Sequence, residues 1–227
     1  MNRKTVPKKT WLSWSSGKDS AWAFYQLRKD PSIELTAIFT TVNKKRSRVV
    51  MHGTRYKLLQ VQASRLKLPL HTVYIPEPCD NKTYLSAMQN LVSKAQQKQI
   101  EQMAFGDLFL QNVRSYREQQ LLNTGIQPIF PLWSRPTTLL AKEMMNSGIK
   151  AIITCVDGKQ LPEEFVGRPY DRAFLDDLPK GVDPCGENGE FHSFVYDAPM
   201  FETLITFKLG QTHRAGQFTF IDVYPFY

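Results

Sequence analysis

The chain has 227 residues, 42% of them hydrophobic and 22% charged, which predicts a globular protein of one large domain or two small ones. It contains no apolar run near the ~20 residues that span a bilayer. Residues 1–9 are charged but lack the apolar segment of a signal peptide, so we expect a solvated tail and no membrane association. The three widely spaced cysteines are typical of a protein in the reducing cytoplasm, and their spacing argues against a structural zinc site. The net charge of +8 predicts an anionic partner.

The first predicted strand, residues 10–14, leads into the sequence Ser-Ser-Gly-Lys-Asp-Ser, and a helix is predicted over 19–29. A polar turn before a helix N-terminus suits anions, because unpaired N–H groups and the helix dipole both face the ligand. Lys18 adds a cation, and Asp19 could hold Mg²⁺, which binds through carboxylate and phosphate oxygens. An ordinary serine-capped turn would have similar residues. The anion-binding candidates are Ser15, Ser16, Gly17, Lys18 and Ser20.

This loop is not a Walker A motif, because Leu12 stands where that motif needs glycine and Asp19 stands where it needs Ser or Thr. It resembles instead the loop of the PP-loop ATP pyrophosphatases, whose usual form is Ser-Gly-Gly-x-Asp-Ser. Those enzymes cleave ATP between the α- and β-phosphates, adenylate an acceptor and release pyrophosphate. Ser16 replaces one glycine of that pattern, a change that is tolerated where the backbone is not forced to positive φ.

Strands and helices continue to alternate along the first half of the chain. Further strands are predicted over 34–41, 70–75, 102–105 and 127–130, and helices over 54–66, 82–98 and 112–124, the last with Gly125 as its C′ residue. Such alternation is typical of a doubly wound parallel α/β sheet.

A second unit begins near residue 131, so we divide the chain into units 1–130 and 131–227. A helix is predicted over 137–147 and strands over 149–156, 201–207 and 217–223. Because the intervening segments are rich in Pro, Gly and Asp, we expect a smaller C-terminal α+β domain.

Ligands of doubly wound sheets bind beyond the carboxyl ends of the strands. Thr40 follows the second predicted strand, where backbone groups could meet an adenine edge. Gly106 and Asp107 follow the fourth, where glycine permits close approach and the carboxylate could bind a metal, ribose or amine. His52 precedes a helix near the same edge, and as a lone histidine it is either structural or part of the site.

A second polar cluster lies between residues 183 and 195. Glu187, Asn188, Glu190 and His192 fall within six residues, next to Gly186 and Gly189. The two carboxylates and the imidazole could share acid–base work or orient an amine nucleophile. The same residue types also make a surface turn that opens a strand at 191–195.

Together the two motifs resemble the diphthine–ammonia ligase family of PP-loop ATPases. Phe-Gly-Asp at 105–107, Phe-Pro-Leu-Trp at 130–133 and Asp-Ala-Pro-Met-Phe at 197–201 extend the resemblance over nearly the whole chain, in the expected order. The family implies an N-terminal nucleotide-binding domain of the adenine nucleotide α-hydrolase type and a C-terminal domain for the acceptor. Its eukaryotic and archaeal members amidate diphthine, and the acceptor here is left open between diphthine and a small-molecule carboxylate.

The resemblance implies ATP as substrate with Mg²⁺ on Asp19. An acceptor carboxylate attacks the α-phosphorus, pyrophosphate leaves through the loop around Lys18, and ammonia then displaces AMP. Glu187, Glu190 or His192 would hold or deprotonate the amine. Expected contacts to the acceptor or a phosphate come from Arg114, Arg117, Trp133, Asn188 and Gly189. For the two arginines a salt-bridged helix face is the competing interpretation, and for Trp133 it is packing at the domain junction.

Two further functions remain open at this stage. A PP-loop tRNA-modifying enzyme would use ATP in the same way, although the sulfur-inserting types need paired cysteines, and nucleic acid is disfavoured as a partner for lack of an RNA-binding module. A non-catalytic adenine-nucleotide-binding protein would keep residues 15–20 but has little use for the acidic cluster. The sequence leaves a homodimer open.

Overall fold

A computed structural model describes residues 6–50 and 52–226, and its first layer is a parallel sheet. The strands are β1 (Lys8–Ser13), β2 (Ile33–Asn43), β4 (Leu70–Ile75), β5 (Gln102–Ala104) and β6 (Gln127–Ile129). They pair in the order β4-β2-β1-β5-β6, and the short β3 (Arg48–Val49) runs antiparallel to the end of β2. The predicted doubly wound parallel sheet is therefore confirmed.

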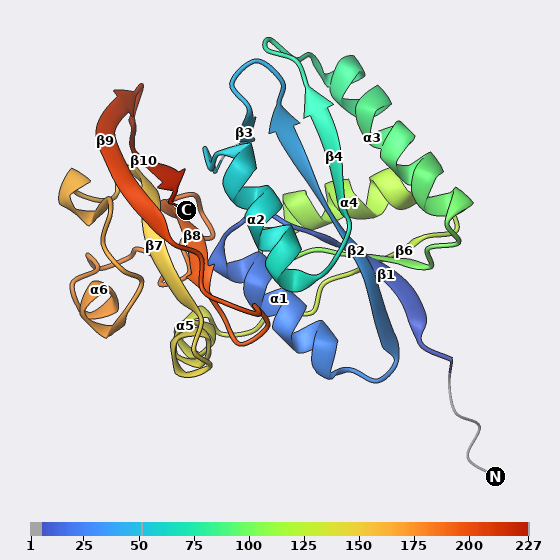
Figure 1. The fold of residues 1–227 in the computed structure, drawn as a ribbon, viewed down its shortest axis with the longest axis horizontal. Helices are drawn as coiled ribbons and strands as arrows, with labels where there is room; N and C mark the ends of the chain where they lie inside the picture. The colour runs from blue at the N-terminus through green and yellow to red at the C-terminus, as the bar shows by residue number, and fades with distance from the viewer. Residues whose placement is uncertain (1–5, 51, 227) are drawn as a thin grey trace.

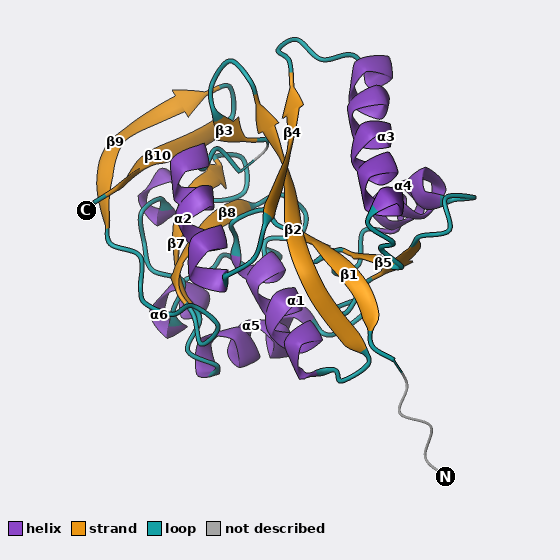
Figure 2. Ribbon diagram, turned by 45° about the vertical axis from the view of Figure 1, so that its right-hand side comes forward, coloured by secondary structure: helices purple, strands orange, loops and turns teal. Residues whose placement is uncertain are grey.

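Helices cover both faces of this sheet (Figure 2). They are α1 (Lys18–Lys29), α2 (Tyr56–Leu66), α3 (Asn81–Gln97) and α4 (Gln111–Leu121). The α1 and α2 side buries Leu12 and Phe24, whereas the α3 and α4 side buries Trp11 and Leu91, so each face of the sheet has its own apolar core. The alternation of Trp11 and Leu12 between the two cores follows from the period of two along a strand.

The strand order creates the crevice in which ligands of such sheets bind. Counted along the chain, the parallel strands are arranged third, second, first, fourth, fifth, so the direction of winding reverses between β1 and β5. Connections leave these two strands toward opposite faces, which leaves an opening beyond their carboxyl ends. Residues 15–20 follow β1 and residues 105–107 follow β5, so both predicted clusters flank this opening.

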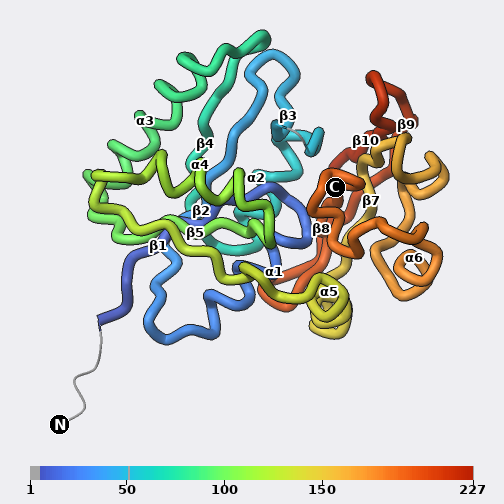
Figure 3. Tube along the Cα trace, turned by 180° about the vertical axis from the view of Figure 1, so that it is seen from behind, coloured from blue at the N-terminus to red at the C-terminus, as the bar shows by residue number. Residues whose placement is uncertain are grey.

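The rest of the chain forms a second, antiparallel sheet beside the first (Figures 1 and 3). Its strands are β7 (Lys150–Asp157), β8 (Phe191–Asp197), β9 (Phe207–Ala215) and β10 (Phe218–Pro225), in the order β8-β7-β10-β9. The accompanying helices are α5 (Thr137–Asn146), the 3₁₀ turn η1 (Glu163–Phe165) and α6 (Arg172–Asp176). The predicted smaller C-terminal α+β unit is confirmed. Within the described part of the chain, no helix has both the length and the apolar character that a membrane crossing requires.

The second sheet packs directly on the loop that follows β1. The Ser16 carbonyl accepts hydrogen bonds from Val195 N of β8 (3.0 Å) and from Gln62 Nε2 of α2 (3.1 Å). Gln62 Nε2 also donates to the Val195 carbonyl (2.7 Å), and its side chain is fully buried. One buried amide thus joins β8, α2 and the loop that we expect to bind phosphate.

Several predicted element bounds are wrong. The strand predicted over 201–207 is a series of bends, and β9 begins only at Phe207, because buried Phe201 and Ile205 pack as separate anchors rather than in a ladder. The last helix of the first unit ends at Leu121, not at residue 124, and Gly125 is not its C′ residue. Asn123 already has a positive φ of 63° in the turn before Gly125. Residues 1–5 of the expected tail lie outside the described residues, and Lys8 and Lys9 begin β1.

Asp222 of β10 joins the two sheets electrostatically. Its carboxylate accepts from Arg55 Nε (2.9 Å), before α2, and from Arg48 Nη2 (2.9 Å), in β3. Burial alone would raise the pKa of Asp222, but the hydrogen bonds from Arg55, Tyr224 and Arg48 lower it to about 2. A folded-state pKa below the unfolded value stabilises the fold above about pH 4, and that contribution is lost as the pH falls toward 2.

We therefore expect Asp222→Asn to lower the free energy of unfolding by about 2 kcal/mol at pH 7. Urea unfolding at a series of pH values measures this, and the wild-type and variant stabilities should converge as the pH approaches 2. Asp177→Asn is the matched control, because Asp177 is exposed and pairs with an arginine, Arg168, at the surface, so its loss should cost less than about 1 kcal/mol. Equal losses in the two variants would contradict the assignment.

Candidate active site

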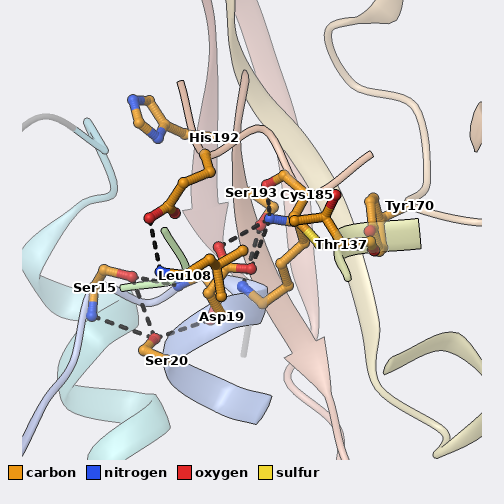
Figure 4. A network of polar contacts seen from close by, with 12 residues as sticks. Ser15, Asp19, Ser20, Leu108, Thr137, Tyr170, Cys185, His192 and Ser193 are labelled. Atoms are coloured by element: carbon orange, nitrogen blue, oxygen red, sulfur yellow. Dashed lines mark hydrogen bonds and ion pairs between the residues drawn. The ribbon is translucent and has the colours of Figure 1, made fainter. Parts of the chain in front are cut away.

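A cavity of about 190 Å³ lies at the switch point between β1 and β5. It is closed on one side by the second sheet, and Figure 4 shows residues of α1 and of the 185–193 segment converging on it. The cavity is smaller than the ~300 Å³ at which pockets for whole drug-sized ligands begin, so it suits a phosphate chain rather than an entire nucleotide. Its lining comprises Ser13, Ser15, Lys18, Asp19, Ser20, His52, Phe105, Gly106, Asp107, Arg117, Gly186, Glu187, Gly189, Phe191, His192 and Ser193.

The loop 15–20 holds its shape through its own hydroxyl groups. Gly17 N donates to Ser15 Oγ (3.3 Å), and Ser20 Oγ donates to the Gly17 carbonyl (2.9 Å). Ser15 Oγ and Ser20 Oγ lie 3.2 Å apart (Figure 4). A Cβ on Gly17 would lie 3.1 Å from the Ser193 carbonyl oxygen, so glycine permits the close approach of β8. Ser15 and Ser20 line the cavity, whereas Ser16 and Gly17, which we also expected to bind phosphate, do not.

We expected serine to replace the glycine of the pattern without strain if the backbone avoids positive φ. Ser16 has a positive φ of 76°, so this replacement is strained. The left-handed conformation costs a non-glycine residue roughly 1–2 kcal/mol. The serine recovers part of this cost, because its buried hydroxyl donates to Thr54 Oγ1 (2.8 Å).

Comparing two variants at Ser16 separates these effects. Ser16→Ala keeps the backbone strain and loses the hydroxyl, whereas Ser16→Gly loses the hydroxyl and relieves the strain. We expect the glycine variant to be more stable than the alanine variant by about 1 kcal/mol. Chemical denaturation measures the difference, and an alanine variant at least as stable as the glycine variant would refute the strained backbone.

Lys18 is buried and its ammonium is already satisfied by protein oxygens. Nζ donates to Asp19 Oδ1 (3.0 Å) and Oδ2 (2.9 Å) and to the Cys185 carbonyl, and the side chain is 2% exposed. It also lies 5.2 Å from the centroid of the Phe191 ring. Burial alone would lower the pKa of Lys18, but the Asp19 carboxylate outweighs this and the pKa is raised. The cation therefore joins the loop to the second sheet.

Three carboxylates from three segments line the cavity. Asp19 comes from α1, Asp107 follows β5, and Glu187 belongs to the turn before β8. Glu187 Oε1 accepts from Leu108 N (2.7 Å), while Asp107 Oδ2 is buried without a hydrogen-bond donor in the described chain. Arg117 Nε is 3.8 Å from that oxygen. Close approach is possible because residue 106 is glycine, where a Cβ would lie 3.2 Å from the backbone of residues 19 and 20.

Burial shifts the proton affinities of these carboxylates. It raises the pKa of Glu187 to about 7, with the Leu108 N–H opposing the shift and Asp19 and Asp107 adding to it. It also raises the pKa of Asp107, against the effect of Arg117. Glu187 therefore exchanges a proton near neutral pH, which is the property of an efficient general acid or base.

The donor set fits Mg²⁺ together with a phosphate ligand. Among residues 6–50 and 52–226, no group of three or more His, Cys, Asp or Glu side chains is placed to hold a metal ion by itself. Mg²⁺ is usually held by one or two carboxylates plus substrate phosphates, so a full protein cage is not needed. The two carboxylates that could hold the ion are those of Asp19 and Asp107. Asp19 is part of the 15–20 loop, and Asp107 Oδ2 has no hydrogen-bond partner among the described residues.

Glu190 does not line the cavity. It is 1% exposed, and its Oε1 accepts from Asp183 N (3.0 Å) and Asn188 Nδ2 (2.9 Å). Both Glu190 and Asn188 therefore hold the shape of the turn 183–190. Gly186 and Gly189, with φ of 67° and 85°, orient Glu187 and Glu190 differently although they are three residues apart.

Two neutral histidines form another wall of the cavity. The ring centroids of His52 and His192 are 4.5 Å apart. Burial lowers the pKa of His192 to about 4, with Lys18 adding to the effect, and burial likewise lowers the pKa of His52 well below its usual range. His52 Nδ1 is buried and has no hydrogen-bond partner within the described residues.

The remaining predicted residues divide between the cavity and its surroundings. Arg117 lines the cavity, but Arg114 pairs with Glu118 Oε1 (2.7 Å) and packs over Trp133, as the salt-bridged-helix and packing interpretations expected. Thr40 is buried within β2, opposite Thr72 of β4, and does not reach the cavity.

Sequence reasoning assigned no binding or catalytic role to five of the lining residues: Ser13, Phe105, Gly186, Phe191 and Ser193. Ser13 ends β1 and Phe105 follows β5, so the strand-end rule could have found them. Ser193 is different, since its Oγ accepts from Lys18 N (3.2 Å) across 175 residues, and nothing in the local sequence predicts that contact.

Two family models cover most of the chain. Residues 8–128 match the diphthamide synthase N-terminal domain and residues 136–223 match the diphthamide synthase C-terminal domain. The chain is 32% identical over 130 residues to a bovine (Bos taurus) protein named diphthine–ammonia ligase, covering 54% of this chain and 49% of that protein. The human (Homo sapiens) protein of the same name is 28% identical over 156 residues, covering 66% of this chain and 58% of its own. The chain thus spans about half the length of these relatives.

Among solved structures, a predicted subunit of tRNA methyltransferase from Methanocaldococcus jannaschii aligns with a TM-score of 0.46 and 15% identity. The alignment covers 84% of this chain and 98% of that one.

Proposed function

Because the chain belongs to the diphthamide synthase family, we propose that it is an ATP-dependent ligase that amidates an acceptor carboxylate with ammonia and releases AMP and pyrophosphate. The observation that carries the proposal is the joint cavity, in which the 15–20 loop meets Asp19, Asp107 and Glu187. The printed name of the bovine and human relatives, diphthine–ammonia ligase, supports this reaction type.

The loop would hold the leaving pyrophosphate. The N-terminus of α1 and the hydroxyl group of Ser15 face the cavity and offer donors to phosphate oxygens, while the Ser20 hydroxyl, which donates to the Gly17 carbonyl, holds the loop in place. An oxygen of the acceptor carboxylate attacks the α-phosphorus, and the bond from the α-phosphorus to the bridging oxygen breaks. The products of this step are an acyl-adenylate and pyrophosphate. Magnesium, held by Asp19 and Asp107 together with phosphate oxygens, would supply positive charge for the leaving group.

Ammonia then attacks the acyl carbon, and AMP leaves. The nitrogen must lose a proton during this step, and ammonium must lose one before it can attack at all. The Glu187 carboxylate, with a pKa of about 7, would accept the proton that the incoming amine loses. Arg117, beside Asp107, would contact the phosphate that becomes AMP. In this scheme Lys18 and Glu190 position the loop and the turn rather than touch the reacting atoms.

We also propose that residues 1–130 form the ATP-binding domain and residues 131–227 the acceptor domain. The two sheets support this division, since the 15–20 loop belongs to the first and the turn with Glu187 to the second. Catalysis would then require both domains, because the cavity is lined by both.

The test is phosphorus NMR on the purified chain with MgATP, ammonium, and either a protein fraction or a small-molecule fraction of the source cells. AMP and pyrophosphate should form only when both ammonium and one of the fractions are present. The active fraction then tells whether the acceptor is a protein side chain or a small molecule. Formation of ADP and phosphate, or turnover that is indifferent to ammonium, would overturn the proposal. Asp19→Asn serves as the inactive control.

A further inference from the structure

The second sheet supplies the hydrogen-bond cap of α1. Gly17, the residue before the helix, has no side chain that could cap it. The N–H of Lys18, the first helical residue, donates instead to Ser193 Oγ of β8 at 3.2 Å (Figure 4). A helix cap normally comes from the residue directly before the helix, whereas this one lies 175 residues away in the sequence.

Strand β8 holds Ser193 firmly against the loop. Two residues further along, Val195 N donates to the Ser16 carbonyl (3.0 Å), so the backbone of the strand is tied to the loop. On its other side Ser193 pairs with Ile153 of β7. A side chain on a strand that is fixed from both sides keeps its position, which suits a ligand-binding group.

The pairing of β8 with β7 is irregular at this point. The register shifts between Ile153 and Cys155, as at a β-bulge, and the three successive residues 191–193 all line the cavity. Side chains of a regular strand alternate between its two faces, whereas a bulge aims them differently and is frequent beside active sites. The irregularity therefore fits a hydroxyl that both caps α1 and borders the cavity.

The Ser193 hydroxyl still has a hydrogen bond to donate. A hydroxyl donates one hydrogen bond and can accept two, and Ser193 Oγ accepts from Lys18 N. Its own O–H has no acceptor among the residues that the structure describes, although the residue is only 2% exposed. A buried donor without an acceptor costs free energy unless a ligand or water accepts its proton. Since Ser193 lines the cavity, an acceptor held there would satisfy it.

An anion fits this donor better than a neutral ligand does. The Lys18 N–H polarises the hydroxyl, so a chain from this N–H through the O–H to an acceptor strengthens both of its hydrogen bonds. The N-terminal end of the α1 dipole lies at the same point and favours negative charge. The Lys18 ammonium is already bound by both oxygens of Asp19, so neutral donors remain to meet the anion.

We propose that the Ser193 hydroxyl is a phosphate ligand that the second sheet contributes to the 15–20 loop. It donates to an oxygen of the leaving pyrophosphate while it accepts from Lys18 N. The hydrogen bond strengthens as negative charge develops on the leaving group. The inference rests on the proposed function for the identity of the anion, but it can be tested by binding alone.

The probe is magnesium pyrophosphate, titrated calorimetrically into the purified chain. Ser193→Ala removes only the hydroxyl and should weaken binding about tenfold or more, as expected for the loss of a hydrogen bond to a charged group. Thr54→Val is the matched control. Thr54 is also buried and hydrogen-bonded to the loop, accepting from Ser16 Oγ (2.8 Å), but it does not line the cavity. This variant should bind the probe within about threefold of the wild type, and thermal melts check that both variants fold.

Equal affinity of Ser193→Ala and the wild type for the probe would overturn the inference. An equal loss in Ser193→Ala and Thr54→Val would overturn it too, because the hydroxyl would then act only by holding the loop. The phosphorus NMR test separates the inference from the proposed function. Probe binding that depends on Ser193, without AMP formation by the wild type, would refute the ligase and leave the inference standing. A wild type that binds neither magnesium pyrophosphate nor MgATP would refute both.

Discussion

Replacing Glu187 by glutamine is expected to slow AMP formation by about 100-fold or more, because the variant cannot accept a proton from the incoming amine. The wild-type rate should rise with pH through about 7, where Glu187 loses its own proton, and the variant should lack that limb. The sign follows from the role: the deprotonated carboxylate is the active form, so activity increases as the pH passes its pKa. Initial rates of AMP release between pH 5.5 and 8.5 measure both effects.

Glu190→Gln is the matched control for this prediction. Glu190 is the same residue type three residues away but is buried inside the turn, where its Oε1 accepts from Asp183 N and Asn188 Nδ2. We expect this variant to lose stability, by about 1–3 kcal/mol, and to keep the limb near pH 7. If the limb disappears with Glu190 and persists without Glu187, the assignment of the base is wrong.

The second large effect is expected at Lys18. Its ammonium is 2% exposed and bound by both oxygens of Asp19 and by the Cys185 carbonyl, so Lys18→Met should cost about 3 kcal/mol of stability. Removal of both charges in Lys18→Met/Asp19→Asn should cost less than the sum of the two single changes, by about 1–3 kcal/mol. Urea unfolding at pH 7 of the wild type, the two single variants and the double variant gives this double-mutant cycle.

A different result would follow if Lys18 acted mainly as a phosphate ligand. The methionine variant would then keep its stability and lose affinity for MgATP alone, and the cycle would be additive. Calorimetric titration of MgATP into the folded single variant distinguishes this case. Because the Lys18 ammonium is buried between two segments, we expect Lys18→Met to lose stability, whatever its effect on the affinity for MgATP.

The first half of the fold could be predicted from the sequence because its elements have a clear local signature. Period-two and helical apolar patterns alternate, so β1, α1, β2 and β4 begin and end within about two residues of their predicted bounds. The strand-end rule also placed Asp107 near the 15–20 loop, since both follow neighbouring strands of the same sheet.

The parts that could not be predicted depend on contacts between distant segments. Glu187 and Glu190 look equivalent in the sequence, and only the positive φ values of Gly186 and Gly189 send one to the cavity and the other to the interior of the turn. The sequence shows Lys18 beside Asp19, but another of its partners, the Cys185 carbonyl, lies 167 residues away.

A second cavity, of about 370 Å³, adjoins the first and is likewise invisible in the sequence. Its walls come from the segment after β2 and from β9 and β10, which are far apart in the chain and carry no shared motif. The residues that it has in common with the first cavity, His52 and His192, were singled out separately and for different reasons. Only the packing of the second sheet against the first brings their rings together.

The central claim is that a carboxylate, and not water, attacks the α-phosphorus of ATP. The most direct measurement is the turnover of MgATP and ammonium with the active cell fraction in H₂¹⁸O, followed by phosphorus NMR of the products. The ¹⁸O shift should be absent from both AMP and pyrophosphate, because the oxygen that AMP gains comes from the acceptor. Label in AMP or in pyrophosphate would mean that water cleaves ATP, and the ligase mechanism would be wrong.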